Sequence, residues 1–333
     1  MSNMKTSRIG SIIAFSLSAI FIALAGWLFL NRQAALDQVA VWAYTPTANI
    51  QTIEERVDFT QKGRFTFYAT HPSVESPDGF NNKCPRQETA SPILGCYTAD
   101  DRVYIYDITN EQLDGMEEVT AVHEMLHAVW ARTSEADRKE LEVNLKAAYE
   151  KRGDDELKER MAYYERTEPG ELVNELHSIL GTEVESLGEP LESYYGELFN
   201  RESVLKLHQK YNAVYKQLYE RSDVLYREMQ VLGKEIQSRS SQYDADVRQL
   251  SADINSFNAR ANNGTFQSQS QFNAERNELI RRSNALDAER DAINGMINTY
   301  NEYYEEYQAI SKQIEVLNDS VDSFKQIEQA PSV

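Results

Sequence analysis

The stretch that decides the fold of the central part of the chain reads AVHEMLHAVW and covers residues 121–130. It contains the pattern H-E-x-x-H, whose spacing places His123, Glu124 and His127 on one side of a helix. The two imidazoles can bind one metal ion, and the carboxylate beside them can reach a water molecule on that ion. Zinc is the ion we expect, because it suits neutral imidazoles and because three protein ligands leave one position for water.

The residues before this stretch predict its structural setting. Residues 102–108 (RVYIYDI) alternate between polar and apolar side chains and predict a strand. The motif helix is expected to start near residues 114–116. Its apolar face is formed by residues at helical spacing, namely Val119, Val122, Leu126 and Val129. A strand that leads into an H-E-x-x-H helix is the typical setting of this motif.

Two upstream segments are assigned from composition. Residues 64–70 (RFTFYAT) are rich in aromatic and β-branched side chains and predict a second strand. Residues 71–98 hold four of the eight prolines and both cysteines, which predicts a loop. If this segment is extracytoplasmic, a disulfide between Cys84 and Cys96 is favoured over a pair of free thiols.

The N-terminal segment predicts a membrane anchor. Residues 9–30 carry no charge and are long enough to cross a hydrocarbon core of about 30 Å. Lys5 and Arg8 lie in residues 1–8, which we expect to stay in the cytoplasm, so that the chain after the span is extracytoplasmic. A cleaved signal peptide with Ala23-Leu24-Ala25 as its processing site is the alternative, but the apolar run is longer than usual for one.

Two histidines do not complete a catalytic zinc site, so a third ligand is expected downstream. The longer pattern H-E-x-x-H-x-x-G-x-x-H is absent, because residues 132–134 (RTS) do not match it. Residues 171–183 (ELVNELHSILGTE) follow Pro169-Gly170 and have the apolar spacing of a helix. This segment holds the side chains that could complete the site: Glu171, Glu175, His177 and Glu183.

A strand, an H-E-x-x-H helix and a later helix with Asn-Glu resemble the gluzincin class of zinc metallopeptidases over residues 100–183. The resemblance implies a glutamate ligand, often in N-E-x-x-[SA]-D, which Asn174 to Ser178 match and which selects Glu175. Glu171, His177 and Glu183 remain alternatives. Ile179 stands where the class has an aspartate that orients a ligating histidine, so that partner must come from elsewhere or be missing.

The same resemblance implies residue roles and an activity. Glu124 would be the general base for the hydrolysis of a peptide bond in a peptide or protein substrate. His177, Tyr194 and Tyr195 are candidates by residue type for stabilising the oxyanion, with His177 as the catalytic residue we select. Packing in the core, or support of the metal ligands, is the alternative interpretation of these side chains.

Residues 201–328 predict a different architecture. The stretch lacks proline, and apolar residues recur in heptads on both sides of Asn262-Asn263-Gly264-Thr265. Four-residue shifts in the first half keep its average period near that of a straight helix. We therefore expect an antiparallel coiled-coil hairpin with arms of roughly 80 to 90 Å at about 1.5 Å per residue. Such a hairpin could bind a protein partner or associate with a second copy.

These assignments combine into one expected organisation. The fold class is α+β and predominantly α, with a small zincin-like domain at 31–200, the hairpin at 201–328 and a tail at 329–333. A net charge of −19 argues against nucleic acid as a partner. We expect a single-pass, membrane-anchored zinc metallopeptidase. The alternative is a non-enzymatic envelope scaffold that acts through its coiled coil and has a structural or vestigial metal site.

Overall fold

The computed structural model describes the chain apart from residues 1–2, 87–91, 153–154, 168 and 330–333. The tails expected at residues 1–8 and 329–333 lie partly outside the described residues. The chain divides into two compact units, one of Met1–Val214 with Leu317–Val333 and one of Tyr215–Val316. Helices predominate and the described strands form one small sheet, which confirms the α+β, mainly α class.

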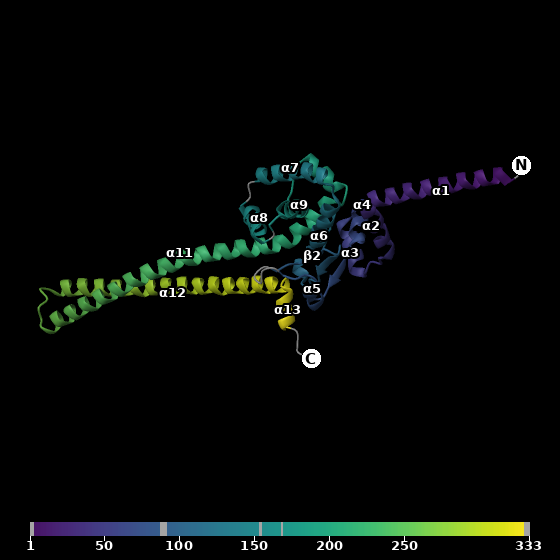
Figure 1. The fold of residues 1–333 in the computed structure, drawn as a ribbon. Helices are drawn as coiled ribbons and strands as arrows, with labels where there is room; N and C mark the ends of the chain where they lie inside the picture. Colours follow the sequence, from purple (N-terminus) through teal and green to yellow (C-terminus); the bar gives the residue numbers. More distant parts are fainter. Residues whose placement is uncertain (1–2, 87–91, 153–154, 168, 330–333) are drawn as a thin grey trace. The chain divides into compact units, whose positions relative to one another are not determined.

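Helices make up most of the first unit (Figure 1). In chain order they are α1 (Asn3–Leu30), α2 (Arg32–Ala43), α3 (Ala48–Val57), α4 (Gln61–Ala69), α5 (Pro77–Lys83), the 3-10 turn η1 (Glu111–Leu113), α6 (Met116–Arg132), α7 (Glu135–Arg152), α8 (Asp155–Thr167), α9 (Leu172–Glu183), α10 (Glu189–Gly196) and, after the hairpin, α13 (Ser323–Gln329). The hairpin helices are α11 (Arg201–Asn262) and α12 (Gln269–Ser320).

The sheet has three short strands in the order β1-β3-β2. Strand β3 (Val103–Tyr106) confirms the strand predicted over residues 102–108. Strand β1 (Ser73–Glu75) runs parallel to β3, and β2 (Gly95–Tyr97) runs antiparallel to it at the opposite edge. Both edge strands and helix α5 lie in the segment predicted as a loop, which is therefore more ordered than its composition suggested.

The strand predicted over residues 64–70 is wrong, because this segment forms most of helix α4. Thr60 caps the helix, and its side-chain oxygen accepts the backbone N–H of Gly63 at 3.1 Å. A Cβ on Gly63 would come 1.9 Å from the backbone oxygen of Leu198. Phe67 is fully buried on the same helix. The cap and the burial of the aromatic face outweigh the local preference for a strand.

Helix α6 lies at the centre of the core and confirms the predicted motif helix and its start. It packs against α9, α3, β2 and β3. Of the predicted apolar face, Val119, Val122 and Leu126 are buried and Val129 is partly buried against the core, and Met125 is buried as well. Helix α9 confirms the helix predicted over residues 171–183, and α7 and α8 in turn contact α9. The H-E-x-x-H helix is therefore fixed on several sides by the core.

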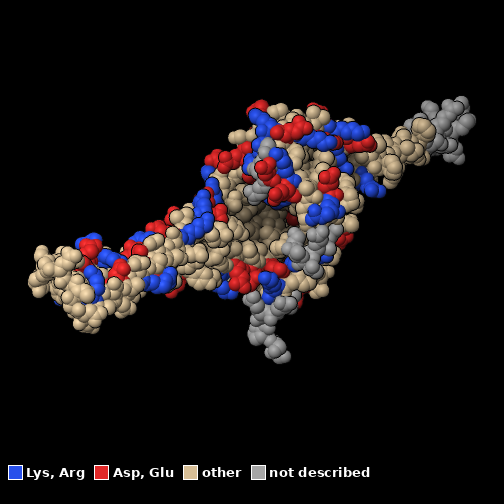
Figure 2. All heavy atoms as spheres, turned by 90° about the vertical axis from the view of Figure 1, so that its left-hand side faces the viewer, with Lys and Arg blue, Asp and Glu red and all other residues tan. Residues whose placement is uncertain are grey.

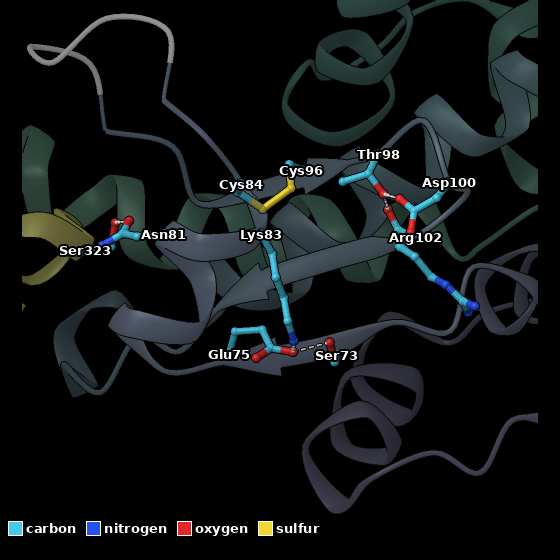
Figure 3. Close-up of a disulfide and its surroundings, with 10 residues drawn as sticks. All are labelled: Ser73, Glu75, Asn81, Lys83, Cys84, Cys96, Thr98, Asp100, Arg102 and Ser323. Atoms are coloured by element: carbon cyan, nitrogen blue, oxygen red, sulfur yellow. Dashed lines mark hydrogen bonds and ion pairs between the residues drawn. A yellow bond between two sulfur atoms is a disulfide. The ribbon is translucent and has the colours of Figure 1, made fainter.

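A disulfide joins Cys84 to Cys96, as the spacing and the expected compartment favoured (Figure 3). Cys84 follows the last residue of α5, and Cys96 is the middle residue of β2. Phe80 and Tyr106 form a small buried cluster with Cys84. The bond therefore ties α5 covalently to the edge strand that lies against α6.

The N-terminal helix includes the predicted span. The backbone of residues 9–30 lies within α1. Among the residues whose side chains are described, no single helix has the length and hydropathy to cross a membrane, but Ala14–Leu30 and Arg32–Ala43, bent by 83°, meet that test as a pair.

The second unit is a pair of long antiparallel helices, as the predicted hairpin requires. The predicted end of the hairpin at residue 328 is wrong, because α12 ends at Ser320 and a separate helix, α13, begins at Ser323. The turn falls at the predicted break, where Gly264 has a φ of +64°. Several ion pairs join the two helices along their length: Arg221 with Glu306, Arg239 with Glu289, Asp253 with Arg282, and Arg260 with Glu275. Apolar residues of both helices, among them Leu225, Leu250 and Ile293, are buried.

The first unit includes more of the hairpin helices than the boundary at residue 201 suggested. Val204 in the first turn of α11 is fully buried in the core of that unit. After α12, Asp322 forms an ion pair with Arg86 at 2.7 Å, and Ser323 donates a hydrogen bond to Asn81 at 2.6 Å. Helix α13 packs on α5. The segments on both sides of the hairpin therefore belong to the first unit.

Candidate metal centre

Three metal-competent side chains converge between α6 and α9. Nε2 of His123 lies 3.6 Å from Oε2 of Glu175, and Nε2 of His127 lies 3.3 Å from Oε1 of the same carboxylate. One ligand atom from each residue lies within 4.8 Å of the other two. The group could therefore hold a metal ion, and it contains the two histidines and the glutamate predicted as ligands.

The chemistry of these donors is that of a metal site. Bonds of about 2 Å in a tetrahedron place neighbouring donors about 3.3 Å apart, which is the distance from His127 Nε2 to Oε1, whereas the 3.6 Å from His123 Nε2 is measured to the other oxygen, Oε2. Glu175 is only 6% exposed. Its burial would raise the pKa of the carboxyl, but a hydrogen bond with His123 and the charges of both histidines outweigh burial and lower that pKa. Zinc accepts an ionised carboxylate together with two imidazoles, which must release their protons when the ion binds.

The other predicted candidates for the third ligand lie apart from this group. Glu171 is exposed and accepts a hydrogen bond from Asn174 at 3.0 Å. Glu183, at the end of α9, accepts two hydrogen bonds from the Arg160 guanidinium, one of them at 2.7 Å. Of the four candidates on this segment, Glu175 is the one that the fold brings to the two histidines.

Ser178 occupies the place expected for a group that orients a ligating histidine. Its Oγ lies 3.5 Å from Nδ1 of His127, on the side of the ring away from Glu175. Ile179, which stands where the resembled class has an aspartate, is buried in the hydrophobic core. The contact missing at position 179 is thus made by the preceding residue, with a hydroxyl in place of a carboxylate.

His177 is buried in the core and does not line the cavity that opens beside His123 and Glu124. Its side chain is fully buried among Trp130, Tyr194 and Tyr195. Nε2 lies 3.0 Å from the Tyr194 hydroxyl, and Nδ1 has no hydrogen-bond partner among the described residues. Burial and the two neighbouring histidines lower the pKa of His177 to about 3. In this conformation His177 has no exposed surface with which to contact a substrate.

Tyr194 and Tyr195 lie beside His177, each with its ring centre 5.5 Å from that of the histidine. Burial raises the pKa of both phenols, and the Tyr195 hydroxyl donates to the backbone oxygen of His177 at 2.7 Å. Neither residue lines the cavity beside His123. Their contacts are those of core residues that support α9, which is the alternative the sequence left open.

A cavity of about 440 Å³ opens beside His123 and Glu124. Figure 2 shows the molecule hollowed on one face, with uncharged surface between groups of charged side chains. Polar and apolar surface contribute about equally to its wall, and the apolar and aromatic residues are Pro92, Ile93, Leu94, Met116, Val119, Leu157, Tyr163, Tyr164, Ile179, Val184 and Tyr211. A cavity of this volume can hold an organic ligand.

Glu124 is held at the edge of this cavity by the sheet. The residue is 7% exposed and lies beside β2, whose first residue, Gly95, also lines the cavity. A Cβ on Gly95 would come 2.6 Å from Cγ of Glu124 and 2.6 Å from Cγ2 of Thr120. The close approach of β2 to α6 therefore depends on the missing side chain at position 95.

The cavity also contains polar residues that the sequence analysis did not identify. Arg160 of α8 pairs with Glu183, and Nε2 of His208 in α11 lies 3.7 Å from the same carboxylate. Burial and the Glu175 carboxylate raise the pKa of Tyr164, so its phenol keeps its proton and can donate. No local motif marks these residues, because Arg160 and Tyr164 lie in α8 and His208 lies in α11, and only the fold places them together.

No protein-family model, no curated protein and no solved structure matches this chain with significance. Function must therefore be inferred from the site itself, from the identity of its donors, their separations and the cavity beside them.

Proposed function

We propose that this chain is a membrane-anchored, extracytoplasmic zinc metallopeptidase that hydrolyses peptide bonds. The observation that carries the proposal is the convergence of His123, His127 and Glu175 next to a cavity lined by His123 and Glu124. Structural zinc sites are closed by four protein ligands. The metal-competent group found among the described residues has three members and borders a cavity, as a catalytic site requires.

The residues around the donors can support hydrolysis. A zinc ion bound to the three donors would supply a Lewis acid that polarises the scissile carbonyl and makes water more acidic. Glu124 would accept a proton from the attacking water and pass it to the amine that leaves when the C–N bond breaks. The Tyr164 hydroxyl and the His208 ring, both in the cavity wall, are candidate donors to the negative charge that develops on the carbonyl oxygen.

Support for the location comes from two features of the chain. The apolar residues 9–30 follow Lys5 and Arg8, a charge distribution that keeps the N-terminus in the cytoplasm. The disulfide between Cys84 and Cys96 is the kind of bond that persists in an oxidising compartment. Both features agree with a single-pass anchor whose catalytic unit lies outside the cytoplasm.

The base assignment is tested with Glu124→Gln in the full-length chain. This variant should keep about one zinc per chain, since Glu124 is not a member of the ligand group, but should lose hydrolysis of a peptide library. Glu171→Gln, an exposed carboxylate before α9, is the matched control and should behave as wild type. Full hydrolysis by Glu124→Gln would disprove the role of this residue as base.

The ligand assignment is tested separately with Glu175→Ala. Zinc content measured on the purified chain should fall well below one per chain in this variant and stay unchanged in Glu171→Ala. If Glu175→Ala retained its zinc, the third ligand would have to be another residue. Zinc binding by the wild type without any Glu124-dependent hydrolysis would favour the alternative function, a scaffold that acts through its coiled coil.

A further inference from the structure

Helix α2 carries a row of apolar side chains that no described part of the chain covers. Leu36, Val39 and Trp42 have exposed fractions of 56%, 59% and 77%. They lie at intervals of three residues, so they form one stripe along the helix. A contiguous apolar surface of this kind on a folded domain marks a site of interaction.

The opposite face of α2 is fixed to the first unit. Asp37 is 5% exposed and accepts two hydrogen bonds from the Arg132 guanidinium, at 2.8 and 3.0 Å. The His71 ring contacts the backbone oxygen of Ala40 at 2.8 Å. Helix α2 also packs along α4. The apolar stripe is therefore held rigidly outward, because the helix that carries it is bound on its other side.

The direction of the stripe follows from the bend between α1 and α2 and from the face of α2 that is bound to the first unit. The two helices meet at an angle of 83° with Asn31 between them. Asp37, on the helical face opposite the stripe, is held by Arg132 of that unit. The stripe therefore points away from the folded part of the first unit.

We propose that α2 is a membrane-surface helix whose stripe of Leu36, Val39 and Trp42 sits in the lipid interface on the extracytoplasmic side. The inference rests on the proposed anchor: if α1 crosses the bilayer, a helix at 83° to it lies nearly in the membrane plane. Tryptophan is enriched at that interface, and Arg32 at the start of α2 is placed to meet lipid phosphates.

Contact of α2 with lipid would orient the metal centre. Arg132, which binds Asp37, is the last residue of α6, the helix that carries His123 and His127. Asp101 binds the same guanidinium at 2.7 Å. The membrane-facing helix is thus connected to the H-E-x-x-H helix through one partly buried ion-pair network, and the catalytic unit would be held at one orientation to the bilayer.

Spin labelling of the full-length chain in bilayer nanodiscs of phosphatidylcholine and phosphatidylglycerol tests this proposal. Both native cysteines are in the disulfide, so the label reacts with the introduced thiol of Val39→Cys. Val143→Cys on α7 is the matched control, since Val143 is a valine with 69% exposure on another helix. The Val39 label should collide more with oxygen, which concentrates in lipid, than with a water-soluble nickel chelate, and the Val143 label should show the reverse.

Three results would overturn the inference. Equal access of the nickel chelate to both labels would place Val39 in water. Protection of the Val39 label from both reagents would indicate a protein partner or a second copy on the stripe. A label at Ile20 of α1 that resides in water would remove the anchor and with it the membrane contact. Zinc content and Glu124-dependent hydrolysis, measured on the same samples, report separately on the proposed enzymatic function.

Discussion

The backbone of Gly95 in β2 lies directly against the side chain of Glu124 in α6, so that a Cβ at position 95 would come 2.6 Å from Glu124 Cγ. Strand β2 can approach Glu124, the proposed base, this closely because residue 95 has no side chain. Because β2 is also joined to α5 through the Cys84–Cys96 disulfide, the position of Glu124 depends on a segment far from the H-E-x-x-H motif in the sequence.

Gly95→Ala should therefore reduce hydrolysis without removing the metal. The added methyl group must displace Glu124 or Thr120, and a displacement of about 1 Å at a reacting group lowers kcat by roughly 10- to 100-fold. Zinc content should stay at the wild-type level. Gly196→Ala is the control, because a Cβ there meets nothing within 4 Å. A wild-type kcat in Gly95→Ala would show that Glu124 tolerates the displacement.

Ser178→Ala should weaken zinc binding by about tenfold, the lower end of the range for groups that orient a metal ligand. The reason is the 3.5 Å contact of its hydroxyl with Nδ1 of His127. Competition with a chelator of known affinity measures the change. Ser251→Ala on the exposed face of α11 provides the comparison. Unchanged affinity in Ser178→Ala would mean that another group orients the ring.

The pair of Asp37 and Arg132 should matter more for stability than an exposed ion pair. Asp37→Ala leaves the largely buried guanidinium with Asp101 as its carboxylate partner and the Ala128 backbone oxygen as an acceptor, and we expect a loss of about 2 to 4 kcal/mol in the free energy of unfolding. Lys139→Ala breaks an exposed pair with Glu135 and should cost less than about 0.5 kcal/mol. Thermal unfolding of both variants measures the difference, and equal Tm values would refute the ranking.

Glu117 should make the first unit less stable as pH rises. Burial raises the pKa of its carboxyl to about 7 from 4.5, although the side chain accepts the Ile108 N–H at 2.7 Å. The folded state therefore binds the proton more tightly than the unfolded state, so stability is full below about pH 4.5 and falls as pH rises through about 7.

Glu117→Gln keeps an acceptor for the Ile108 N–H but cannot ionise. At pH 8 this variant should be more stable than wild type by about 1 to 2 kcal/mol, and at pH 4.5 the two should unfold alike. Tm measured at both pH values gives the comparison. A difference in Tm that does not change with pH would contradict the assignment.

Removing the disulfide should destabilise the first unit by about 3 kcal/mol, the value expected for a loop closed by two cysteines 12 positions apart. The double variant Cys84→Ala/Cys96→Ala leaves no unpaired thiol, and its Tm in non-reducing buffer should match that of the reduced wild type. A reducing agent should leave the Tm of the double variant unchanged. If reduction of the wild type did not lower Tm, the bond would contribute nothing to stability.

Long-period patterns in this sequence predicted the structure well. The helical spacing around His123 and the heptads on both sides of Gly264 each extend over many residues, and the corresponding helices α6, α11 and α12 form where expected. Short elements were not predictable in the same way. Strands β1 and β2 have three residues each, too few to show an alternation, and they form because β3 lies between them.

The segment around Phe67 shows why local composition misled. Its aromatic and β-branched residues favour a strand, but the close approach of Gly63 to Leu198 involves a residue more than a hundred positions away. The candidate site was likewise predictable only in part. His123 and His127 follow from spacing, and the resemblance at Asn174 to Ser178 pointed to Glu175, which the fold brings to the two histidines. The contacts of Arg160 and His208 with Glu183 join different helices, and no pattern within one helix contains them.

The contacts of Asp322 with Arg86 and of Ser323 with Asn81 have a consequence for biosynthesis. They join residues 236 and 242 positions apart, and the whole hairpin lies between them in the sequence. A ribosome must therefore complete the hairpin before the first unit can close these contacts. Contacts of such long range form late in folding. We expect Arg86 and Asn81 to form these contacts only after Asp322 and Ser323 have been translated. This part of the unit would therefore fold after most of the chain has been synthesised.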